Sequence, residues 1–237
     1  MKKRIIMKTQ NNTSVRFSPT AWAKLVYLRD LTDNEVGGFG ISRAEDLLFI
    51  TDFELVKQNV NPVSVLFDDD SVADFFESQV KKGNKPQQFA RIWVHTHPGS
   101  SSLPSATDEE TFTRVFGGCD WSVMVIVAQN SNSYARIRFS TGPGCECVIP
   151  VKVDYDCSFE SPDFKAWKKQ YTKNVSADKF FNTYKGFEAA GRTTSFGKNL
   201  SSADILDELE LMEPFEREYF LEELSIRSDF WDESEEV

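Results

Sequence analysis

The segment Trp93-Val94-His95-Thr96-His97-Pro98 contains both histidines of this 237-residue chain. Alternate residues of an extended strand point to the same side, so His95 and His97 project together, about 7 Å apart at the backbone. Asp108 follows soon afterwards, at the start of the next expected element. Of all placements of two histidines in a chain of this length, about 1 in 120 puts them two residues apart. We therefore interpret the pair as a selected binding feature.

Two imidazoles and a carboxylate placed in this way can bind a single ion. Three nitrogen and oxygen ligands, with a fourth position left to water, are the arrangement of catalytic zinc sites. His95, His97 and Asp108 are therefore the candidate ligands of Zn²⁺. Alternatively, the histidines are ordinary strand-end residues, and Ser105 with Asp108 is a capping box that opens a helix. A capping box is compatible with metal binding, because a helix start is a rigid mount for a ligand.

Apolar periodicity around this segment predicts an α/β fold, with a mixed β-sheet sandwiched by helices. Strands are predicted at 3–8, 14–17, 34–41, 47–51, 53–58, 63–67, 89–95, 121–128, 134–139 and 147–153. Helices are predicted over 18–33, from 68–70 to about 80, and over 105–116. These elements predict one domain over residues 1–155.

The composition changes after residue 155. Residues 156–200 contain a basic amphipathic segment at 164–173 and a linker at 186–199 that is rich in Gly, Ser, Thr and Lys. Residues 201–237 hold 14 acidic and 2 basic residues, with apolar residues at helical spacing. We predict an acidic helical tail that could dock to a protein partner. The alternative is a solvated, partly disordered terminus.

Composition also excludes several classes of function. The net charge of −10 arises in residues 201–237, and the first 200 residues show no dense Lys/Arg stripe, so nucleic-acid binding is not expected. No apolar run reaches the ~20 residues of a membrane span, and the N-terminus lacks the apolar core of a signal peptide. The few, clustered cysteines predict a reducing, cytoplasmic compartment. Cys145, Cys147 and Cys157 are either a second metal site or buried, inert thiols.

The string from His95 to Asp108 reads H-x-H, seven residues, then S-x-x-D. This string resembles the signature of the JAMM (MPN-plus, JAB/Mov34) zinc metalloprotease family, in its compact prokaryotic form. Glu35, in Asn-Glu-Val-Gly-Gly, matches the family's upstream glutamate on a glycine-containing strand. The resemblance covers about residues 3–153 and implies the MPN/JAMM architecture, which is similar to that of cytidine deaminases. Zinc deaminases themselves are excluded, because they require H-x-E and a paired cysteine motif.

The resemblance implies a zinc-dependent peptidase that hydrolyses the isopeptide bond at the C-terminus of a ubiquitin-like modifier. His95, His97 and Asp108 would hold Zn²⁺, which lowers the pKa of a bound water to about 7. Glu35 would act as general base and then as general acid, and the Ser105 hydroxyl would stabilise the oxyanion. Alternatively, Glu35 is a surface carboxylate, and the glycines after it only permit a close approach of backbones.

Other functions remain open within the same fold. The substrate could instead be a sulfur-carrier adduct or a peptide, or the chain could be a non-catalytic MPN scaffold that docks through its acidic tail. Linkage-selective members of the family carry a long insertion after the metal aspartate, and Asp108 leads here through one helix directly into the 121–128 strand. We expect the 63–67 strand to be a sheet edge that pairs with the extended tail of a substrate.

Overall fold

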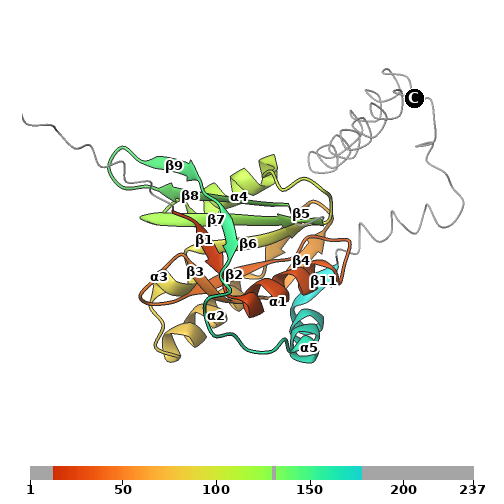
Figure 1. The fold of residues 1–237 in the computed structure, drawn as a ribbon. Coiled ribbons are helices and arrows are strands. Elements are labelled where there is room, and N and C mark those ends of the chain that lie inside the picture. Colours follow the sequence, from red (N-terminus) through yellow and green to blue (C-terminus); the bar gives the residue numbers. More distant parts are fainter. Residues whose placement is uncertain (1–12, 130–131, 178–237) are drawn as a thin grey trace, which may run out of the picture. The chain divides into compact units, whose positions relative to one another are not determined.

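The computed structural model of this protein describes residues 13–129 and 132–177. The strand predicted at 3–8, the linker at 186–199 and the acidic helices at 201–237 lie outside these residues. The described residues form an α/β fold on a curled, mixed β-sheet (Figure 1). None of the helices in these two ranges is both long enough and apolar enough to cross a membrane.

The larger sheet has the strand order β10-β1-β3-β2-β6-β7-β8-β9. Its strands are β1 (Val15–Phe17), β2 (Gly37–Ser42), β3 (Phe49–Glu54), β6 (Ile92–His97), β7 (Trp121–Ala128), β8 (Ser133–Phe139), β9 (Cys145–Val148) and β10 (Val151–Val153). β1 is parallel to both of its neighbours and β6 is parallel to β7, whereas the other pairs are antiparallel. The predicted α/β class with a mixed sheet is therefore confirmed.

Helices pack on both faces of this sheet. α1 (Pro19–Arg29) begins after Ser18, whose hydroxyl accepts a hydrogen bond from the Ala21 amide, and it packs on the face that carries Val94 of β6. α2 (Asp69–Lys81) and α4 (Ala106–Phe116) pack on the opposite face, which carries Trp93. Because β6 alternates between the two faces, its histidines lie on the same face as Trp93, toward α4.

The two edge strands of the larger sheet are joined by only two residues. β9 pairs with β8 at one edge and β10 pairs with β1 at the other, with Ile149 and Pro150 between them. The Ile149 amide donates to Ala135 O, and Val15 N donates to Pro150 O, each at 2.9 Å. The prediction of a single strand over 147–153 is wrong, because the chain changes partners at a proline that has no N–H to donate.

A second sheet has the order β11-β4-β5 and consists of β4 (Gln58–Asn61), β5 (Ser64–Phe67) and β11 (Val175–Ala177). The segments predicted as strands at 47–51 and 53–58 therefore divide differently, because β3 ends at Glu54 and the chain then leaves the larger sheet. β5 lies at an edge, as predicted for residues 63–67.

The remaining helices are α3 (Pro86–Phe89), which was not predicted, and α5 (Phe164–Asn174), which corresponds to the predicted amphipathic segment. Tyr27 of α1 contacts the rings of Phe164 and Trp167 in α5, with centroids 5.1 and 5.9 Å away. β11 then pairs in parallel with β4. The packing of the described residues thus continues beyond residue 155.

Candidate metal centre

Both histidines come from a central strand of the larger sheet. β6 lies between β2 and β7; it runs to His97, directly before Pro98, and it begins at Ile92 rather than at Phe89, which belongs to α3. The two side chains are only 0% and 5% exposed. The Trp93 ring stacks on the His95 ring with centroids 4.2 Å apart and planes inclined by 24°. This contact restricts the rotation of the His95 ring.

Asp108 lies in the first turn of α4. Ser105 is the N-cap, and its hydroxyl accepts a hydrogen bond from the Asp108 amide at 3.1 Å. In return, Asp108 Oδ2 accepts hydrogen bonds from the Ser105 amide at 2.8 Å and from the Ser105 hydroxyl at 3.0 Å. The capping box considered in the sequence is therefore present. It fixes the Asp108 carboxylate and leaves that carboxylate able to face the histidines.

Glu35 lies in the turn between α1 and β2, two residues before the strand begins. Its side chain is 4% exposed, so the alternative of a surface carboxylate is wrong. The Glu35 amide donates to Asn61 O at 3.0 Å. Two further hydrogen bonds join Val36 to Thr96, which stands between the two histidines on β6. Hydrogen bonds thus join the backbone of Glu35 to β4 and that of its neighbour Val36 to β6.

The glycines that follow Glu35 allow other parts of the chain to come close. A Cβ atom on Gly38 would lie 2.3 Å from the carbonyl oxygen of Glu54, and one on Gly37 would lie 2.9 Å from Val65 Cγ1. Neither distance is compatible with a normal contact. The interpretation that these glycines permit close approach is therefore confirmed, and it does not compete with a role for Glu35.

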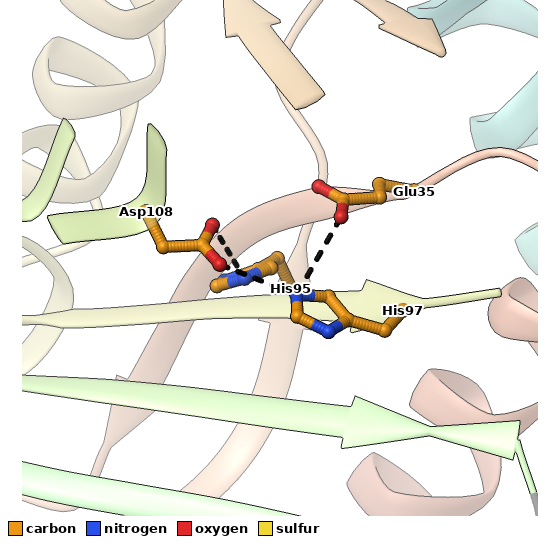
Figure 2. A group of neighbouring side chains, drawn as sticks. All are labelled: Glu35, His95, His97 and Asp108. Atoms are coloured by element: carbon orange, nitrogen blue, oxygen red, sulfur yellow. Dashed lines mark ion pairs between the residues drawn. The ribbon is translucent and has the colours of Figure 1, made fainter. Parts of the chain in front are cut away.

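The four side chains converge on one point, as Figure 2 shows. His95 Nε2 lies 3.0 Å from Asp108 Oδ1, and His97 Nε2 lies 3.3 Å from Asp108 Oδ2. Glu35 Oε1 lies 3.5 Å from His97 Nε2. One ligand atom from each of the four residues lies within 4.8 Å of all the others. This buried group could hold a metal ion.

Three of the distances between ligand atoms in the group match those around a tetrahedral ion. Bonds of about 2.0–2.1 Å to nitrogen and oxygen place two ligand atoms about 3.3 Å apart, and the three distances above lie close to this value. The Nε2 atoms of His95 and His97 are buried near carboxylate oxygens, but their angles do not make N–H···O hydrogen bonds. The two Nε2 atoms face the same space as the carboxylate oxygens and form no hydrogen bonds with them. This is the arrangement expected of metal ligands.

The charge states in the site also suit metal binding. His97 Nδ1 lies 3.0 Å from Ser101 O, which can only accept, so the contact selects the tautomer of the neutral ring in which Nδ1 carries the proton and Nε2 the lone pair. Burial lowers the pKa of His95 and so favours the neutral ring. Burial alone would raise the pKa of Asp108, but the two imidazoles that face its carboxylate oxygens outweigh burial and hold that pKa well below its usual range. Asp108 is therefore ionised at neutral pH.

The lowered pKa values of His95 and Asp108 bear on how metal binding depends on pH. Because burial lowers its pKa, His95 in the folded protein is neutral more often at pH 6.5 than an ordinary histidine, which is half protonated there. We expect the affinity for Zn²⁺ to fall as the pH is lowered from 8 to 5, because protons compete with the metal for the histidine ligands. Competition with a chromophoric chelator from pH 8 to 5 measures this. An affinity that stays constant down to pH 5 would contradict the ligand assignment.

Several supporting residues were missed in the sequence. Trp93 could have been found, because it shares a strand face with His95 at a spacing of two. Thr96 and the carbonyl of Ser101 carry no signal in a single sequence, since the first has a distant partner and the second belongs to the backbone.

The cysteines were predicted as either a second metal site or buried thiols, and both alternatives are wrong. Within residues 13–129 and 132–177, Cys145, Cys147 and Cys157 belong to no metal-binding group. Cys145 and Cys147 are exposed on the edge strand β9, and Cys157 is partly exposed. None of the three forms a disulfide. β9 has a neighbouring strand on one side only, and all four of its residues are exposed.

The centre thus consists of two histidines and two carboxylates from three separate places: β6, the start of α4 and the connection before β2. All five residues singled out in the sequence lie here, with Ser105 bonded to Asp108. Comparison with known proteins finds neither a family model nor a curated protein that matches this chain.

Proposed function

We propose that this protein is a zinc-dependent isopeptidase of the JAMM type, which hydrolyses the amide bond at the C-terminus of a ubiquitin-like modifier. The observation that carries the proposal is the convergence of His95, His97 and Asp108 beside a buried glutamate. The spacing of these residues matches the family signature, and their donor set suits Zn²⁺. When bound, Zn²⁺ supplies Lewis-acid chemistry that polarises a carbonyl and makes water a stronger acid.

Glu35 would move the proton in this reaction. Its carboxylate lies beside His97 Nε2 at 3.5 Å, within reach of a water that enters the centre. Glu35 would accept the proton of the attacking water and return it to the departing lysine amine. Burial of the carboxylate excludes bulk water from competing for that proton.

Ser105 would stabilise the developing oxyanion. Its hydroxyl now donates to Asp108 Oδ2 at 3.0 Å, so it must rotate to reach a substrate oxygen. The Ser105 amide, which donates to the same Oδ2 at 2.8 Å, would keep Asp108 in place during that rotation. A donor of this kind is commonly worth about 3 kcal/mol in the transition state.

The edge strand β5 would receive the extended tail of the modifier. Val65 and Phe67 cover Gly37, next to the centre, whereas Leu66 is 61% exposed. We expect the amides of Ser64–Phe67 to gain protection from hydrogen exchange when a ubiquitin-like protein is added, because backbone pairing buries them. β9, an edge strand of the larger sheet, is the internal control and should not change. Equal protection at both edges would contradict this binding mode.

The experiment that tests the function uses the purified, zinc-loaded protein. Ubiquitin-like modifiers linked to a lysine side chain through their C-terminal glycine are incubated with it, and the products are identified by mass spectrometry. We expect cleavage directly after the glycine and loss of cleavage after chelation of the metal. Cleavage of short peptides alone would assign the same centre to a peptidase, and undiminished cleavage by the chelated protein would refute the metal mechanism.

We also propose a cellular compartment and a protein partner. The absence of a disulfide among the four cysteines supports a reducing compartment, and we propose the cytoplasm. The acidic segment 201–237, outside the described residues, would bind a protein partner.

A further inference from the structure

A buried glutamine forms hydrogen bonds to the first residue of the strand that follows Glu35. Gln58, the first residue of β4, is 3% exposed. Its Oε1 accepts a hydrogen bond from the Gly37 amide at 2.9 Å, and its Nε2 donates to Gly37 O at 2.8 Å and to Val56 O at 3.0 Å. All three bonds go to the backbone. One side chain thus binds both polar backbone groups of a residue two positions after Glu35.

The side chain of Gln58 makes the hydrogen bonds to Gly37 that a neighbouring strand would otherwise make. β3 pairs with β2 only from Phe39 onward, so Gly37 has no partner on that side of β2. On the other side, Gly37 stands opposite His95 in the pairing of β2 with β6. The amide of Gln58 therefore completes the hydrogen bonding of Gly37 as a neighbouring strand would. Gly37, the residue bound by Gln58, is thus the residue that pairs with His95, a candidate metal ligand.

Glu35, Val36 and Gly37 are each held by hydrogen bonds of their backbone. The Glu35 amide donates to Asn61 O of β4, Val36 exchanges two hydrogen bonds with Thr96 of β6, and Gly37 is held by Gln58. β4 thus supports the segment at both ends, through its last residue and through its first. β11 pairs along β4, with Val175 opposite Gln58, and so stiffens this support.

We propose that Gln58 is a positioning residue that sets the carboxylate of Glu35 relative to His95 and His97. The proposal rests on the proposed function, in which Glu35 transfers the proton. Gln58 acts only through the backbone of Gly37 and Val36. Proton transfer needs heavy atoms within about 3 Å, and an error of 1 Å in a catalytic group can lower the rate about 100-fold.

A second glutamine provides a matched control. Gln88 is 8% exposed and binds Ser42, at the opposite end of the same strand: its side-chain Nε2 donates to Ser42 O, and its backbone carbonyl accepts from the Ser42 hydroxyl. Substitution of either glutamine by methionine keeps the length of the side chain and removes its amide. Gln58→Met therefore removes three side-chain hydrogen bonds, two of them to β2, and Gln88→Met removes two, one of them to β2, but only the first substitution acts beside Glu35.

Hydrogen exchange followed by NMR, on the metal-free protein, tests the positioning directly. In the unmodified protein the Gly37 amide should exchange slowly, like the amides within β6, and fast exchange would overturn the proposal even if no variant folds. In Gln58→Met we expect at least tenfold faster exchange at Glu35 and Val36 as well as at Gly37. In Gln88→Met these three amides should be unchanged. Loss of protection at Gly37 alone would show that Gln58 does not position Glu35.

Kinetics provides the second measurement. In Gln58→Met we expect kcat for a modifier conjugate to fall about 10- to 100-fold, with KM and zinc content unchanged, whereas Gln88→Met keeps kcat. An unchanged kcat in Gln58→Met would overturn the proposal. If the unmodified protein cleaves no conjugate, the proposed function fails, and hydrogen exchange still decides whether Gln58 holds the Glu35 segment.

Discussion

Asp108→Ala is expected to lower the affinity for Zn²⁺ at least about 100-fold and to remove all hydrolysis that depends on the metal. Asp108 contacts both histidines, at 3.0 and 3.3 Å, so its loss removes one ligand and the one carboxylate that the two rings share. Loss of an outer-shell partner typically costs 10- to 100-fold in affinity, and loss of a direct ligand costs more. Elemental analysis after dialysis, followed by competition with a chelator, measures the change.

Glu109→Ala is the matched control for this substitution. Glu109 is the next residue in the same turn of α4 and carries the same charge, but its carboxylate binds Arg136 at 2.6 Å. We expect this variant to retain about one zinc ion per chain. Equal loss of zinc from both variants would mean that disturbance of α4, and not removal of a ligand, explains the result. Retention of zinc by Asp108→Ala would refute the ligand set.

Much of this centre could be predicted because its signals are local. The spacing of His95 and His97 and the capping box that holds Asp108 depend on residues close in sequence, and the period of two placed the histidines on one face. Glu35 was found through the family resemblance, which places a glutamate on a glycine-containing strand upstream of the histidines. Its burial, however, depends on β4 and β6, which are distant in the chain, and no local pattern reports it.

The errors in the fold have the same origin. Residues 147–153 read as one apolar strand, but Pro150 divides them between opposite edges of a curled sheet. A strand pattern identifies which residues extend and not which partner they choose. Gln58 shows the limit most clearly, because a buried glutamine that replaces a strand cannot be told from a surface glutamine in a single sequence.

Glu35→Gln is expected to keep the metal and to lower kcat by about 100- to 10,000-fold, the range that general acid–base catalysis contributes. The amide has the shape of the carboxylate but cannot accept the proton of water. Glu35 contacts one histidine, at the longest of the three distances, whereas Asp108 contacts both. Zinc content, kcat and KM of the variant, with the modifier conjugate as substrate, measure the outcome.

This substitution also separates two kinds of zinc site. The 3.5 Å between Glu35 Oε1 and His97 Nε2 is close to the spacing of two ligands on one tetrahedral ion, so Glu35 could be a fourth ligand. Four protein ligands make a closed, structural site, and Glu35→Gln would then weaken zinc binding and the stability of the fold together. Three ligands leave one position open, and the variant would then bind zinc normally and fail only in turnover. A variant that loses zinc and stability would therefore assign the centre to a scaffold, and one that keeps zinc and full turnover would remove Glu35 from the mechanism.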